Sequence, residues 1–270
     1  MADITDGAIA NYQVFRRTEG ASNKTINNEV GTLRALLRRY RLWAQVSPDV
    51  RMLPVREDAG RALSQEEETT LLLACAVSRS RSLLPAVTTA LSTGLRYEEL
   101  RLLTWRQIDF ANKAVTVGKS KTEHGAGRAV PLNNRALNAL TAWAREFPNR
   151  RPSHYVFPSE KAGVATDDRI PAVFDTKPET PIGSWKTAWT TARENAGVTC
   201  RFHDLRHTTV TRLLERGVAF AVVATVMGWS PATSVRMAKR YGHIGPSAQR
   251  EAMARLDSGT AGPEDSATVQ

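Results

Sequence analysis

Apolar side chains recur at helical spacing along much of this chain. Residues 25–43, TINNEVGTLRALLRRYRLW, show the clearest apolar stripe, at Ile26, Val30, Leu33, Leu37 and Tyr40. Ser64 and Glu67 form the S-x-x-E capping pattern that starts a helix ahead of the apolar run TTLLLACAV. Further helices are predicted from Pro85 to Gly94, over 96–105, 133–147, about 184–196, 204–216, about 219–227 and about 232–241.

The period changes from helical to alternating between these helices. Residues 113–121, KAVTVGKSK, alternate, as do residues 128–132, RAVPL, and the glycine-bearing loop TEHGAG lies between them. This pattern predicts a β-hairpin or a pair of strands in a small sheet. The elements together favour a mostly α fold with a small antiparallel β-sheet, an α+β class.

Three stretches show no sustained period. Residues 44–62 are broken by prolines and are expected to form a linker. Residues 158–183 are rich in Pro, Gly, Asp and Thr and are expected to form a long surface excursion. The polar tail 256–270 has no basic residue and is expected to be disordered. The predicted organisation is a short helical region with its linker at 1–62, a main domain at 63–255, and this tail.

The charge balance changes the picture more than the composition does. A hydrophobic content of 41% is ordinary, but 37 Lys and Arg face 27 Asp and Glu, and the formal charge is +10. This excess favours a polyanionic partner, most often a nucleic acid. Cys75 and Cys200 form neither a metal-type spacing nor a disulfide framework, which indicates a reducing compartment. With no signal peptide and no apolar run near about 18 residues, a cytoplasmic location without a membrane partner is expected.

Arginines gather on the predicted helix 25–43. Arg34, Arg38 and Arg41 follow at i, i+4 and i+7, and no acidic residue occurs from position 30 to 48. A solvated helix face is one interpretation. The absence of balancing acids favours the other, a helix laid along a phosphate backbone.

Candidate catalytic side chains occur in five stretches. They are Arg96 in STGLRYEELRLLTW, Lys119 and Lys121 in VGKSKTEHGAGRAVPL, His203, Arg206 and His207 in FHDLRHT, Trp229 in VMGWSPATS, and Tyr241 in VRMAKRYGHI. Paired guanidinium groups clamp a phosphodiester, because each can donate two hydrogen bonds to phosphate oxygens. Neighbouring cations lower a tyrosine pKa and improve the nucleophile, and a lysine on a hairpin can protonate a leaving alkoxide. Together these groups could cut DNA without a metal or cofactor.

The H-x-x-x-H spacing of His203 and His207 also occurs in zinc sites. A zincin-type site would need Glu where Asp204 stands, and a third ligand. No metal site is therefore expected.

In this order, the stretches TGLRYEEL, HDLRHT and MGWSPATSVRMAKRYGH resemble the tyrosine recombinase (phage integrase) family, over residues 63 to about 250. The resemblance implies that Arg96 and Arg206 clamp the scissile phosphate and that Tyr241 attacks it, forming a 3′-phosphotyrosyl bond. His203 would bond the phosphate and take part in proton transfer, and Trp229 would donate its indole N–H to a phosphate oxygen.

The resemblance implies supporting roles for four more residues. Lys121 would protonate the leaving 5′-oxygen, and Lys119, the competing candidate, would contact a phosphate or end a strand in solvent. Glu99 matches a frequent acidic position beside the first arginine, and His207 would brace the active-site helix by a buried hydrogen bond.

The expected function is site-specific recombination that integrates or excises a prophage or other mobile element. The resemblance implies double-stranded DNA as the partner, a homotetramer on two sites, accessory DNA-bending proteins, and a location with the bacterial nucleoid. Relatives carry a first helical domain of about 80–100 residues, a typical small-domain size. Here only 62 residues stand before the main domain, so its first helices are expected to be short or absent. Two alternatives stay open: a truncated DNA-binding remnant that no longer cuts, and a type IB topoisomerase-like relaxing enzyme.

Overall fold

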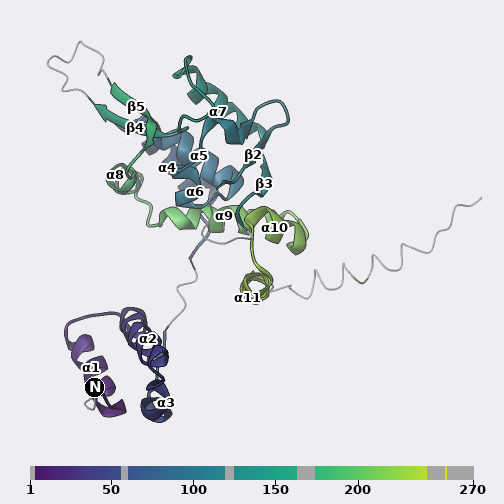
Figure 1. Ribbon diagram of the computed structural model, residues 1–270. Coiled ribbons are helices and arrows are strands. Elements are labelled where there is room, and N and C mark those ends of the chain that lie inside the picture. Colours follow the sequence, from purple (N-terminus) through teal and green to yellow (C-terminus); the bar gives the residue numbers. More distant parts are fainter. Residues whose placement is uncertain (1–3, 56–59, 119–124, 163–173, 242–252, 254–270) are drawn as a thin grey trace, which may run out of the picture. The chain divides into compact units, whose positions relative to one another are not determined.

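A computed structural model describes residues 4–55, 60–118, 125–162, 174–241 and 253, and shows a mostly helical chain with two small antiparallel sheets (Figure 1). The predicted fold class is confirmed. Contacts divide the chain into two units, residues 1–59 and 60–270. The prediction for the tail at 256–270 lies outside the described residues.

The first unit is a small helical cluster. It contains α1 (Asp6–Thr18), α2 (Asn23–Arg39), α3 (Trp43–Val46) and the short 3₁₀ helix η1 (Ser47–Asp49). The side chains of Thr5 and Ser22 accept bonds from backbone N–H groups of the first turns of α1 and α2. Ile9, Ile26, Val30 and Val46 form its core.

Helix α1 has 13 residues and lies in a stretch for which no helix was predicted. It buries only Ile9 and Gln13, so its apolar stripe is weak in the sequence. The helix predicted over 25–43 ends at Arg39, because Arg41 adopts a left-handed backbone with φ 59° that a helix cannot continue. A separate helix, α3, then begins inside what was expected to be helix and linker.

Helix α5 (Leu83–Thr93) lies at the centre of the second unit. All its residues except Leu84 and Ser92 are buried, as expected of a helix that is apolar all round. The hydroxyls of Thr89 and Thr93 donate to carbonyls one turn earlier, at 2.7 and 2.6 Å, so they are satisfied inside the core. Gly94 ends the helix with φ 65°, as predicted.

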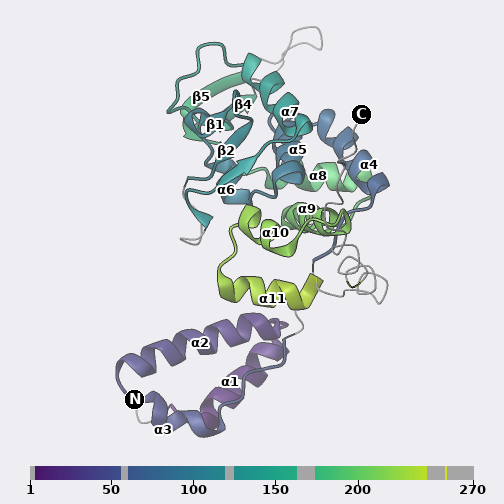
Figure 2. The same ribbon diagram turned by 90° about the vertical axis from the view of Figure 1, so that its right-hand side faces the viewer.

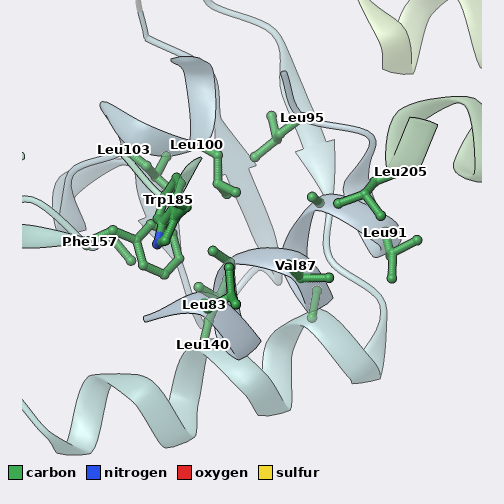
Figure 3. Packing of buried hydrophobic residues seen from close by; sticks show 14 of the residues in the cluster. Leu83, Val87, Leu91, Leu95, Leu100, Leu103, Leu140, Phe157, Trp185 and Leu205 are labelled. Carbon is green, nitrogen blue, oxygen red and sulfur yellow. The ribbon is translucent and has the colours of Figure 1, made fainter. Parts of the chain in front are cut away.

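Three helices surround α5. They are α4 (Gln65–Ala76), α7 (Asn134–Arg145) and α9 (Phe202–Glu215). Figure 3 shows leucines of α5 packing with Leu140 of α7 and Leu205 of α9. The buried carboxylate of Glu68 on α4 also pairs with Arg135 of α7 and Arg212 of α9. The predicted capping box of Ser64 and Glu67 starts α4.

The predicted hairpin is confirmed for its described strands. β2 (Ala114–Thr116) pairs antiparallel with β3 (Ala129–Pro131), and Val115 faces Val130 with both side chains buried. A short β1 (Ile108–Asp109) extends this sheet. The surface excursion expected at 158–183 is wrong in part, because β4 (Pro158–Ala162) and β5 (Phe174–Pro181) form a second antiparallel ladder.

The remaining elements of this unit are α6 (Tyr97–Arg101), the 3₁₀ helix η2 (Trp105–Gln107), α8 (Lys186–Ala196), α10 (Phe220–Met227) and α11 (Pro231–Tyr241). In both views α9, α10 and α11 follow one another on the side of the unit away from the β4–β5 ladder (Figures 1 and 2). In the described ranges, no helix is both long enough and apolar enough to cross a membrane.

Candidate active site

Helix α9 carries three of the candidate residues on one side. Asp204 caps its start, since the carboxylate accepts from the backbone N–H of Arg201 at 2.7 Å and from the Arg201 side chain at 2.9 Å. Burial raises the pKa of Asp204, but these bonds from Arg201 lower it more, and it ends below its ordinary value. The helix start is thereby fixed by an ionised carboxylate, and His203, Arg206 and His207 follow within one turn.

Arg206 is a buried arginine that joins three helices. Only 5% of it is exposed. Its Nη1 donates to the Gly94 carbonyl at 2.6 Å and its Nη2 to the Met227 carbonyl at 2.5 Å, at the ends of α5 and α10. Burial, and next the positive charge of Arg96, lower the pKa of Arg206 to about 9, so the group is still charged at neutral pH. An anion beside it would offset both effects.

Glu99 holds two arginines in place beside Arg206. The carboxylate is 2% exposed and accepts from Arg96 Nη1 at 2.7 Å and from Arg128 Nη2 at 2.6 Å. It also accepts from the Arg96 backbone N–H at 3.0 Å, which starts α6. Arg128 further donates to the carbonyls of Val226 and Gly125, at 3.0 and 2.6 Å. This network ties α6, β3 and the end of α10 together.

Tyr241 lies at the end of α11 against aromatic side chains. Its hydroxyl is hydrogen-bonded to Nδ1 of His207. The Trp229 ring stacks on it, with centroids 6.5 Å apart and planes at 13°. His203 packs edge-on against His207, with centroids 5.0 Å apart. Burial, followed by the charge of Arg206, lowers the pKa of His203, which favours its neutral form at neutral pH.

These side chains form one electrostatic cluster. Arg96, Arg128, Glu99 and Tyr241 each act on the pKa of Arg206, and Arg96 and Arg206 both act on that of His203. Three guanidinium groups, with Glu99 as the carboxylate they surround, suit a bound anion. A hydroxyl beside them can attack that anion's central atom. In the described part of the chain, no group of three or more His, Cys, Asp or Glu could hold a metal ion.

The structure thus brings together Arg96, Glu99, His203, Arg206, His207, Trp229 and Tyr241. Lys119 and Lys121 lie outside the described residues. Of the basic positions in the first unit, Arg38 and Arg41 are exposed, while Arg34 is half-buried and its guanidinium lies 5.5 Å from the centre of the Trp43 ring. Arg41 follows the end of α2, so it does not continue the helical face that was predicted.

Sequence reasoning missed Arg128. Its stretch, RAVPL, predicted only a strand, and a strand residue's burial depends on what packs over it. The available signal was an arginine placed at the start of a short alternating run, beside a loop that holds candidate lysines.

Comparisons with known proteins agree with one another. The model of the "Phage integrase family" matches residues 61–247. The integrase of Salmonella phage P22 is 31% identical over 232 residues, which cover 84% of this chain and 55% of that protein. The shufflon-specific DNA recombinase of Escherichia coli is 27% identical over 260 residues, covering 90% of this chain and 59% of that protein. The chain therefore spans little more than half the length of these two relatives.

Solved structures with the same fold include two integrases bound to DNA. The Tn1549 transposon integrase, in complex with a circular-intermediate DNA, has a TM-score of 0.69 at 19% identity and covers 94% of this chain and 86% of that one. A lambda integrase dimer bound to a core site has a TM-score of 0.63 at 18% identity and covers 87% of this chain and 79% of that one. These likenesses show the fold.

Proposed function

Because the chain belongs to the phage integrase family, we propose that it is a tyrosine-type site-specific recombinase, which cuts and rejoins DNA through a 3′-phosphotyrosyl intermediate. The observation that carries the proposal is the cluster in which Arg96 and Arg128 pair with Glu99 near the buried Arg206, on whose pKa the charge of Tyr241 also acts. Several guanidinium groups gathered in this way suit a bound anion. A phosphodiester is that anion.

The proposed reaction assigns each group a task. Arg96 and Arg206 bind the non-bridging phosphate oxygens and stabilise the charge that grows on them, as preorganised donors do. The Tyr241 oxygen forms a bond to phosphorus while the bond to the 5′-oxygen breaks, and Lys121 gives that oxygen a proton. His203 bonds the phosphate and assists proton transfer, and Trp229 donates its indole N–H.

Rejoining reverses these steps with a different 5′-hydroxyl. The phosphotyrosyl bond keeps the energy of the broken linkage, so strand exchange needs no cofactor. Glu99 holds Arg96 in the position that this chemistry requires.

The proposed partner is a double-stranded recombination site of a prophage or other mobile element, in the bacterial cytoplasm with the nucleoid. Arg38 and Arg41, with Arg34, contact its backbone, and so does Lys119. One structural neighbour is a lambda integrase tetramer bound to a Holliday junction, with a TM-score of 0.63. We propose the same number of subunits here, with accessory DNA-bending proteins.

Covalent trapping tests the proposed function. Purified protein is mixed with labelled duplexes, including the DNA that flanks its own gene, each carrying a nick that prevents rejoining. The expected product is a protein–DNA adduct that resists SDS and is absent for Tyr241→Phe. Native-gel binding serves as the control, since Tyr241→Phe keeps every guanidinium group and should bind the duplex as the native chain does.

The outcomes separate the alternatives. Binding without an adduct would favour a remnant that no longer cuts. An adduct on every duplex, with relaxation of supercoiled plasmid, would favour a topoisomerase-like enzyme. An adduct that survives in Tyr241→Phe would exclude Tyr241 as the nucleophile.

A further inference from the structure

The imidazole of His207 lies between the proposed nucleophile and a glycine. On one edge, Nδ1 is hydrogen-bonded to the Tyr241 hydroxyl, and the two ring centroids are 6.3 Å apart. His203, one turn earlier on α9, packs against the ring at 88°. Of these two histidines, His207 is the one whose nitrogen bonds the oxygen that would attack phosphorus.

Gly60 lies against the other edge of the same ring. A Cβ atom on Gly60 would stand 2.5 Å from Cδ2 and 2.7 Å from Nε2 of His207, closer than real Cβ contacts come. The backbone of Gly60 also has φ 56°, a conformation that side chains rarely allow. Both the space and the backbone therefore require glycine here, and a methyl group at this position would displace the His207 ring.

A carboxylate oxygen lies on the same side of the ring as Gly60. Asp204 Oδ1 would stand 2.9 Å from the same Cβ position that approaches His207 Nε2. Asp204 is 3% exposed and is held by Arg201, so its position is fixed. For the Tyr241 hydroxyl to donate to Nδ1, the ring proton must be on Nε2, and the charge of Asp204, which interacts with His207 from that side, favours this tautomer.

Resting on the recombinase function proposed above, we infer that His207 is the base that takes the proton of the Tyr241 hydroxyl, with Gly60 against the other edge of its ring and the Asp204 carboxylate on that same side. As the Tyr241 oxygen bonds to phosphorus, its O–H bond breaks and an N–H bond forms at Nδ1. The bond from phosphorus to the 5′-oxygen breaks, and that oxygen takes its proton from the separate acid, Lys121. In rejoining, Nδ1 returns its proton to the tyrosine oxygen.

The first experiment compares single-turnover adduct formation in the full-length native chain and His207→Asn, on saturating nicked duplex. The asparagine amide can stand where Nδ1 stands and hydrogen-bond to Tyr241, but it does not accept a proton near neutral pH. The adduct should form about 10²–10⁴ times more slowly, the usual contribution of a general base. The rate of the variant should rise roughly tenfold per pH unit where the native rate levels off, because hydroxide replaces the base.

A rate for His207→Asn within about threefold of native, with an unchanged pH profile, would reduce His207 to a brace and overturn the inference. Among the described residues, the charged and titratable groups whose contacts place them at the ring are His203, Asp204 and Tyr241, so the pH profile of His203→Asn is recorded beside it.

Gly60 supplies a second variant with a matched control. Gly60→Ala should slow adduct formation because its methyl group displaces the His207 ring. Gly217→Ala has a similar backbone penalty, at φ 76° just past α9, but meets nothing within 4 Å and should cleave at the native rate. Equal rates for the two variants would count against the held ring.

A measurement without DNA keeps this inference separate from the proposed function. Nitrogen NMR of the histidine side chains should show His207 with its proton on Nε2 at neutral pH, and its Nδ1 shift should change in Tyr241→Phe. A proton found on Nδ1 would rule His207 out as the base. A native chain that forms no adduct while keeping this NMR signature would instead contradict the recombinase function alone.

Discussion

Glu99→Gln tests how much of the second unit's stability depends on the carboxylate between two arginines. The substitution keeps the shape of the side chain and removes its charge. Both carboxylate oxygens accept from guanidinium groups, Arg96 on one side and Arg128 on both. A glutamine must turn its NH₂ toward one of these donors, so two like-charged groups are left without their counter-charge in a buried place.

The expected loss is large because Glu99 and Arg128 are almost completely buried. The Glu99 side chain is 2% exposed and that of Arg128 is 7% exposed. Removing one partner from a buried ion pair costs about 3–5 kcal/mol. Arg96 is 21% exposed and can turn to water, so the lower end, about 3 kcal/mol, is expected. Glu98→Gln is the matched control: its carboxylate is 62% exposed, pairs with Arg101, and should change stability by less than about 1 kcal/mol.

The assay is urea unfolding followed by tryptophan fluorescence, since every tryptophan except Trp43 lies in residues 60–270. The double variant Glu99→Met with Arg128→Met removes both charges of one ion pair. It should lose less stability than the sum of the losses of the two single variants, Glu99→Met and Arg128→Met. Equal losses for Glu99→Gln and Glu98→Gln, or strict additivity in the double variant, would refute the buried network as the source of the stability.

Three further predictions follow from other parts of the structure. Arg38→Gln and Arg41→Gln should weaken binding to all duplexes alike. Each should reduce the slope of log affinity against log salt concentration by about 1, measured by fluorescence anisotropy. An unchanged slope would argue against contacts with the DNA backbone. Gly94→Ala should destabilise more than Gly197→Ala in urea, because both have φ 65° but only the first would place a Cβ 2.6 Å from Met227; equal losses would show that Met227 moves aside. Burial and the charge of Arg206 lower the folded-state pKa of His203, so its contribution to stability is present above about pH 6.5, the ordinary histidine value, and is lost as the pH falls below it. Between pH 7 and 5 the native chain should therefore lose more stability than His203→Asn. Equal losses for the two proteins would contradict this.

The helix ends could be predicted because their signals are local. The Ser64–Glu67 capping box and the left-handed Gly94 each need only a few neighbouring residues, and both occur as expected. The β4–β5 ladder could not be predicted in this way. Its strands contain Pro158, Pro178 and charged residues, and they exist because two segments pair across the chain. Helix α1 was missed for a related reason, since Ile9 is its one buried apolar residue.

The candidate site shows the same division. The spacing of His203 and Arg206 places them on one side of a helix whatever surrounds it. The partners of those residues depend on tertiary packing. Nothing in HDLRHT indicates that Arg206 would bond the carbonyls that end α5 and α10, or that Gly60, from before the first helix of this unit, would lie against His207.

Arg206 therefore has two tasks that one measurement cannot separate. Its guanidinium is part of the cationic cluster, and the same nitrogens satisfy the carbonyls of Gly94 and Met227. Carbonyls at the end of a helix carry partial negative charge, so a cation there stabilises α5 and α10 together. Met227 is two residues before Trp229, which stacks on Tyr241. Under the proposed function, a phosphate that draws Arg206 toward itself would act on the segment that carries Tyr241, so the residue proposed to bind the anion would also position the proposed nucleophile.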